Sequence, residues 1–97
     1  MQRRVVVTGL GVVCGLGTTV DDYWAALSAG QSAISPIGHL GEGTRISIGA
    51  MVPDFDPDQH FSSAELSLLD RFSQFALLAA REALADAGLA AREDAAV

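Results

Sequence analysis

Few residues of this chain have side chains suited to nucleophilic or acid–base chemistry. The only cysteine is Cys14, and the two histidines are His39 and His60. A cysteine nucleophile needs a cationic neighbour or a helix N-terminus to stabilise its thiolate, whereas Cys14 lies among valines and a leucine. Neither histidine has a carboxylate at a spacing that would orient its imidazole for proton transfer. We therefore expect Cys14 to be a small apolar filler, both histidines to have surface or capping roles, and no residue here to be catalytic.

Three aspartates, Asp54, Asp56 and Asp58, alternate with apolar residues in a short proline-containing segment. Their oxygens would suit calcium, but a calcium loop of the helix-loop-helix kind needs a glycine at its sixth position and a glutamate at its twelfth. Counted from Asp54, these positions are Gln59 and Glu65, so the glycine is missing. The cysteine and histidines also lack the spacing of a zinc site. We expect a stiff loop with solvated acids, and no metal site.

A glycine-rich stretch follows the first apolar run and raises the question of a cofactor. The dinucleotide fingerprint needs Gly-x-Gly-x-x-Gly at the start of a helix. Starting from Gly9 and Gly11, the third position is Cys14, and the first helical pattern begins several residues later. No Gly-Lys-Ser or Gly-Lys-Thr phosphate loop is present. We expect a structural turn here and no bound cofactor.

Charge and apolar runs exclude several classes of partner. The net charge is -6, and the six basic residues are all arginines scattered along the chain, so no basic stripe exists for nucleic acid. No apolar run approaches the length of a membrane span or the apolar region of a signal peptide. With one unpaired cysteine, these features favour a cytoplasmic protein that binds neither nucleic acid nor membrane.

The elements expected around these residues begin with a strand at 3–8, where three consecutive valines are typical of a strand buried on both faces. Helix periodicity and two early aspartates predict a helix at 20–29. Residues 31–60 contain three prolines and four glycines, so we expect a long excursion with one edge strand at 44–52.

The strongest helical pattern runs over 64–87, after a capping box formed by Ser62 and Glu65. This helix is apolar nearly all round, which is typical of an interior helix. Residues 95–97 resemble the start of a second strand, so the order predicts a βαβ unit that lacks its closing strand. With 49% apolar and 19% charged residues, a 97-residue chain has too little polar surface to cover itself, and we expect it to be part of a larger body.

Taken together, three ordered blocks resemble the N-terminus of the β-ketoacyl-acyl carrier protein synthases, particularly the elongating type II enzymes. The likeness covers essentially all 97 residues. The blocks are Arg3-Arg-Val-Val-Val-Thr-Gly-Leu-Gly-Val-Val13, then Tyr23-Trp24 through Gly30-Gln-Ser-Ala-Ile34, and Leu69-Asp-Arg-Phe72 through Ala83-Leu-Ala-Asp-Ala-Gly-Leu89.

The resemblance implies an α/β, thiolase-like fold with five αβαβα layers, of which residues 1–97 form the N-terminal, incomplete part of the first half. It further implies an acyltransferase of fatty acid or polyketide biosynthesis, a homodimer that condenses malonyl-acyl carrier protein with an enzyme-bound acyl thioester. The family's catalytic cysteine and two histidines belong to later motifs that Cys14, His39 and His60 do not match, so the segment alone is expected to be inactive. The alternative is a non-catalytic ketosynthase-like subunit of the chain-length-factor type, which acts through its dimer interface.

One departure from the family concerns acyl carrier protein, the partner that the resemblance implies. Bacterial members often carry lysines and arginines near the start of the long helix, where this acidic protein docks. Here residues 64–68 read Ala-Glu-Leu-Ser-Leu, and Arg71 is the nearest basic residue.

Overall fold

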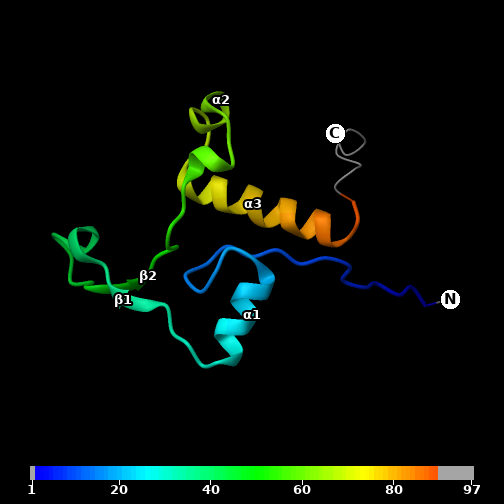
Figure 1. Cartoon of the computed structure of the whole chain (residues 1–97), viewed down its shortest axis with the longest axis horizontal. Coiled ribbons are helices and arrows are strands. Elements are labelled where there is room, and N and C mark those ends of the chain that lie inside the picture. The colour runs from blue at the N-terminus through cyan, green and yellow to red at the C-terminus, as the bar shows by residue number, and fades with distance from the viewer. Residues whose placement is uncertain (1, 90–97) are drawn as a thin grey trace.

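The computed structural model describes residues 2–89 and consists of short helices and one small hairpin along an open path (Figure 1). The two longest helices, α1 and α3, lie on either side of the N-terminal segment, and the hairpin lies apart from α3 (Figure 1). In chain order the elements are α1 (Val20–Ser28), β1 (Ile34–Pro36), a 3₁₀ turn (Gly38–Gly41), β2 (Ile48–Ala50), a second 3₁₀ turn (Pro57–Gln59), α2 (Ser63–Leu66) and α3 (Arg71–Asp86).

Helix α1 confirms the pattern predicted for 20–29, ending one residue early at Ser28. Thr19 is its N-cap, and the Thr19 hydroxyl accepts a hydrogen bond from the Asp22 backbone N–H at 3.2 Å. Gly30 follows the helix with a φ of 75°, a left-handed conformation that favours glycine. The local sequence therefore determines both ends of this helix.

The long excursion holds two strands, where one was predicted. β1 pairs antiparallel with β2, with Ile34 opposite Ala50 and Pro36 opposite Ile48. The strand predicted at 44–52 is therefore real but only three residues long. Its partner was missed because Ile-Ser-Pro is too short for a period of two, and proline is expected only at the edge of a sheet.

The single helix predicted over 64–87 is wrong, because the chain breaks between α2 and α3. The capping box is confirmed, since the Ser62 N–H donates to Glu65 and the Glu65 N–H donates to Ser62. The Ser67 hydroxyl donates to the Ala64 carbonyl at 2.7 Å, and Asp70 is extended at φ -80° and ψ 172°. The Ser67 hydroxyl competes with the helical backbone in this way, and Asp70 begins α3 without a side-chain capping bond, so the break needs neither proline nor glycine.

The N-terminal valines do not form the buried strand that was predicted. Residues 2–13 carry no strand assignment, and Val5, Val6 and Val7 are 94%, 68% and 79% exposed. No other part of residues 2–89 runs beside them as a strand, so the predicted βαβ unit does not form within the described residues. The second strand expected at 95–97 lies outside the described residues.

The described residues bury very little apolar surface. The only buried hydrophobic residues among them are Ala26 and Phe61, and Gln74 is the one buried polar residue. The radius of gyration is 16.7 Å, whereas a compact chain of this length would have roughly 12.5 Å. Helix α3, predicted to be interior, has Phe72 72% exposed. Many apolar side chains of the described residues are therefore exposed.

None of the helices in the described part of the chain is long and apolar enough to cross a membrane.

Candidate functional site

Cys14 lies in a tight turn of the glycine-rich loop. Its backbone N–H donates to the Gly17 carbonyl at 2.9 Å, and the Gly17 N–H donates back at 3.2 Å. The side chain is half-buried and forms no disulfide. The geometry gives Cys14 a backbone role in the turn, and its lack of a catalytic role stays a prediction.

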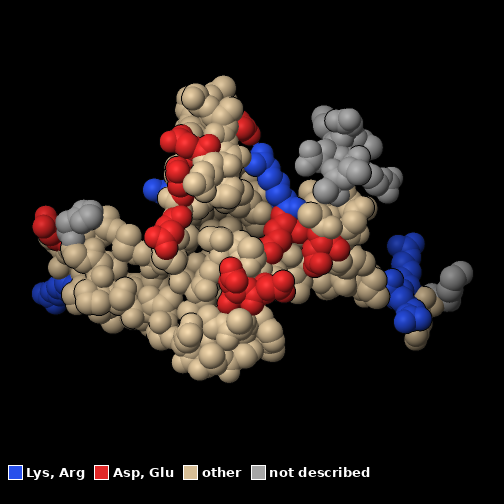
Figure 2. All heavy atoms as spheres, viewed as in Figure 1, with Lys and Arg blue, Asp and Glu red and all other residues tan. Residues whose placement is uncertain are grey.

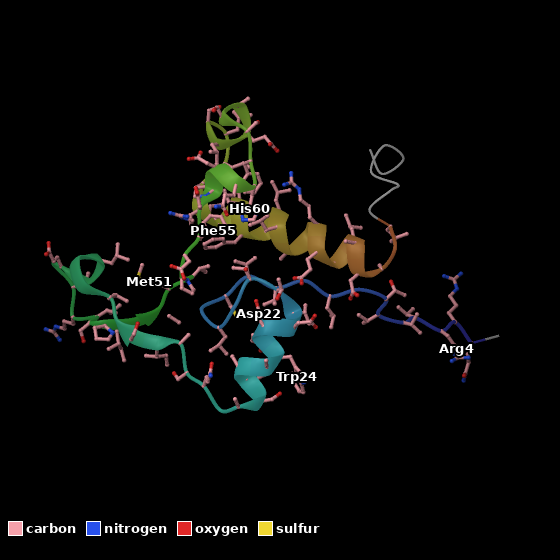
Figure 3. The ribbon with its side chains drawn as sticks, viewed as in Figure 1. Arg4, Asp22, Trp24, Met51, Phe55 and His60 are labelled. Atoms are coloured by element: carbon pink, nitrogen blue, oxygen red, sulfur yellow. The ribbon has the colours of Figure 1, made fainter. Side chains whose placement is uncertain are left out.

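The two histidines lie in different turns. His39 belongs to the first 3₁₀ turn, Gly38–Gly41. His60 follows the second 3₁₀ turn and stacks on Phe55, with ring centroids 5.7 Å apart and planes inclined by 9°. His60 and Phe55 lie beside the start of α3 (Figure 3). The structure therefore assigns the His60 ring to an aromatic contact.

The three aspartates shape the loop between β2 and α2. Asp54 is the one non-glycine residue with positive φ, at 52°, among the described residues. The Asp56 carboxylate caps the second 3₁₀ turn by accepting the Asp58 N–H at 3.1 Å. Within residues 2–89, no three His, Cys, Asp or Glu side chains gather in a way that could hold a metal ion.

An aromatic and arginine cluster joins the loop, α2 and α3. Phe55 contacts Phe75 edge-on at 4.9 Å between centroids, and the Arg71 guanidinium lies 5.0 Å from the Phe55 centroid. Arg81 lies 5.1 Å from the Phe61 centroid and donates to the His60 carbonyl at 3.3 Å. Cation–π contacts of this kind are worth about 0.5–1 kcal/mol when exposed. Both arginines of this cluster thus help to hold the fold.

Glu65 connects the capping box to this cluster. The pKa of Glu65 is lowered below its ordinary value of 4.5, chiefly because the Ser62 backbone N–H donates to the carboxylate. Arg81, 3.4 Å away, lowers the pKa further by a smaller amount. Glu65 thus pairs with Arg81, whereas Arg71, the basic residue nearest to 64–68 in the sequence, lies over the Phe55 ring.

Two open hollows flank Phe55. The first, of 460 Å³, lies between the glycine-rich loop and the aspartate loop, and the second, of 470 Å³, is more apolar. Neither includes Cys14. The first is lined by Leu16, Gly17, Thr18, Asp22, Pro53, Asp54, Phe55, Gln59 and His60. The second is lined by Leu40, Ala50, Met51, Val52, Phe55, Arg71 and Phe75.

The contact that sequence reasoning missed joins the glycine-rich loop to two acids of α3. The Glu82 carboxylate accepts the backbone N–H groups of Val12 at 3.0 Å and Val20 at 2.9 Å. The Asp86 carboxylate accepts the Leu10 N–H at 3.0 Å. The sequence does contain a signal for this contact, because Glu82 and Asp86 are two acids four residues apart near the end of an apolar helix. Figure 2 shows acidic side chains gathered across the middle of this face, with basic ones at the N-terminal end and at a few scattered places elsewhere.

Comparison with known proteins gives the class of this chain. The family described as "Beta-ketoacyl synthase, N-terminal domain" matches residues 2–96. The chain is 44% identical over 93 residues to the 3-oxoacyl-[acyl-carrier-protein] synthase 2 of Coxiella burnetii, covering 95% of this chain and 22% of that protein. It is 46% identical over 86 residues to the tetracenomycin polyketide synthase ketoacyl synthase beta subunit of Streptomyces glaucescens, covering 88% and 21%.

A solved structure agrees with these relatives. The ishigamide ketosynthase/chain length factor superposes with a TM-score of 0.79 at 42% identity, over 92% of this chain and 22% of that one. The chain therefore belongs to the β-ketoacyl synthase family, within its N-terminal domain. It spans 21–23% of the length of the relatives it matches. This likeness supports the thiolase-like α/β class predicted from the sequence.

Proposed function

We propose that this chain is the N-terminal scaffold segment of a β-ketoacyl-acyl carrier protein synthase with the five-layered αβαβα fold. The complete enzyme takes an acyl group onto a cysteine and condenses it with malonyl-acyl carrier protein, with loss of carbon dioxide. The observation that carries the proposal is the unbroken match over residues 2–96 to a condensing-enzyme family. The exposed Val5–Val7 run supports it, because an extended apolar segment without a partner gains stability only from further strands.

In this proposal the segment contributes structure and no catalytic group. Cys14 lies in a backbone-bonded turn and His60 is stacked on Phe55, so neither is presented as a nucleophile or base. The cysteine and two histidines of the reaction come from the remaining length of the enzyme. We place that enzyme in the cytoplasm as a homodimer whose partner is acyl carrier protein, serving fatty acid or polyketide synthesis.

A second candidate is a non-catalytic subunit of the chain-length-factor type. The observation that favours it is the 46% identity to a ketoacyl synthase beta subunit, together with the likeness to a ketosynthase/chain length factor structure. The acidic character of residues 64–68 also fits a subunit that does not itself receive an acidic carrier protein. Reading the gene downstream distinguishes the two. A cysteine and two histidine motifs within about 300 residues support the enzyme, and replacement of that cysteine supports the alternative.

The scaffold role is tested with a chimera in which this chain replaces the matched segment of the Coxiella burnetii synthase. The rate of condensation with malonyl-acyl carrier protein is compared with that of the unaltered Coxiella enzyme. We expect the chimera to fold and to retain activity within about tenfold, because the catalytic groups lie in the retained part. A chimera with a cooperative melt but no condensation would contradict the proposal.

A further inference from the structure

The N-terminal segment lies against α3 through backbone N–H groups, and every acceptor is a carboxylate oxygen. Leu10 donates to Asp86, Val12 donates to one oxygen of Glu82, and Val20 donates to the other. All three distances are between 2.9 and 3.0 Å, and the sequence separations are 76, 70 and 62 residues. These are charge-assisted hydrogen bonds, which are about twice as strong as neutral ones.

The spacing of donors and acceptors matches closely. Leu10 and Val12 are two residues apart, and alternate N–H groups of an extended segment point to the same side about 6.6 Å apart. Glu82 and Asp86 are four residues apart on α3, where four residues rise about 6 Å. The pairs run in opposite directions, with Leu10 beside Asp86 and Val12 beside Glu82. A shift of the segment by one residue would turn these N–H groups away from the carboxylates, and a shift by two would bring Val7 or Val13 to a position where only glycine fits against α3.

Glycines bring the segment close enough for this pairing. A Cβ atom on Gly9 would meet the backbone of Ala83 and Ala87, and one on Gly11 would meet the backbone of Ala79 and Ala83. The alanines of α3 provide the complementary shallow surface. The two carboxylates and the small residues between them therefore share one face of the helix.

We propose that Glu82 and Asp86 act as a register latch for the N-terminal segment. Their carboxylates accept the N–H groups of the segment, as the backbone carbonyls of a neighbouring strand would do in a sheet. In this way they determine which residue of the segment lies beside which turn of α3. Through its second oxygen, Glu82 also holds Val20, the first residue of α1. The latch thereby positions the exposed Val5–Val7 edge and the start of α1 relative to α3. The latch is inferred from contacts within this chain, and its test in the chimera rests on the proposed function.

Site-resolved hydrogen exchange on the chimera described above tests the latch without reference to activity. Glu82→Ala should accelerate exchange at the Val12 and Val20 amides by about tenfold to a hundredfold, and leave Leu10 within about threefold. Asp86→Ala should do the converse. Glu65→Ala is the matched control, because that carboxylate bonds to Ser62 and Arg81 and should leave all three amides unchanged.

Glu82→Gln separates the latch from general loss of the fold. Its amide keeps one acceptor oxygen and nearly the same volume, so only one of the Val12 and Val20 amides should accelerate. Unchanged exchange at Val12 and Val20 in both Glu82 variants would overturn the latch. Equal acceleration throughout α3 in Glu82→Gln would also overturn it, because the residue would then support the fold without setting the register.

Discussion

Replacing Gly11 by alanine is expected to displace the N-terminal segment from α3. The added Cβ would meet the Ala79 carbonyl oxygen and would lie 2.8 Å from the Ala79 carbonyl carbon and 2.9 Å from the Ala83 nitrogen. All three are backbone atoms of a helix, so none can rotate away. Ordinary contact requires about 3.5–4.0 Å, so the segment must retreat by more than about 1 Å.

The loss in the free energy of unfolding can be estimated from the steric contact that is added and the hydrogen bond that is broken. Overpacking against a rigid neighbour costs about 1–3 kcal/mol. The hydrogen bond from Val12 to Glu82, 3.0 Å long, would stretch beyond 3.5 Å, and a bond to a charged group contributes about 1.5–3 kcal/mol. The expected loss in the free energy of unfolding is therefore about 2.5–6 kcal/mol, a large part of the roughly 5–15 kcal/mol that stabilises a typical domain.

Urea unfolding of the chimera, followed by circular dichroism, measures this loss. Gly49→Ala is the matched control, since its Cβ would meet only one side-chain atom, the Cγ2 methyl of Ile37 at 3.0 Å, and should change the free energy by less than about 1 kcal/mol. Equal stabilities for the Gly11→Ala and Gly49→Ala chimeras would refute the close docking of the loop on α3.

Three further outcomes follow from the same contacts. Because the pKa of Glu65 is lowered, its ionised form stabilises the fold above its unfolded pKa, and that contribution is lost as the pH falls through the lowered value. The thermal midpoint of the chimera should therefore exceed that of its Glu65→Gln variant near neutral pH, and the gap should close in acid; a gap that is independent of pH would count against this reading. Arg81→Met removes the bond to the His60 carbonyl and the contact with Phe61, and should lower the free energy of unfolding by about 1–2 kcal/mol in urea titrations; no measurable change would show that the exposed cluster contributes nothing. The chain on its own, with Val5–Val7 exposed, should associate and melt without cooperativity in light scattering and calorimetry; a cooperative melt from a monomer would contradict its reading as part of a larger body.

Local signals in the sequence were sufficient where a side chain bonds to its own neighbourhood. Thr19, the first-turn aspartates and Gly30 determined α1, and Ser62 with Glu65 determined the start of α2. These features depend on residues within four positions of one another, so a single sequence contains the required information.

The errors arose where distant contacts or competing polar side chains decide the outcome. The break before α3 depends on Ser67, whose hydroxyl bonds to the Ala64 carbonyl, and on the extended backbone of Asp70, whereas hydrophobic periodicity alone favours a continuous helix. The strand at 3–8 was inferred from its valines, but pairing needs a partner that residues 2–89 do not supply. The Glu82 contact joins residues 62 and 70 positions apart, which periodicity cannot predict.

The proposed role of this segment is that of a scaffold within a β-ketoacyl synthase, with no catalytic group of its own. It is tested most directly by the condensation rate of a chimera in which Cys14→Ser, His39→Gln and His60→Gln are combined. We predict a rate within about threefold of the unmutated chimera, because none of these groups takes part in the chemistry. Loss of a nucleophile or general base costs about 10²-fold or more, so a fall of that size in a chimera that remains folded would contradict the account.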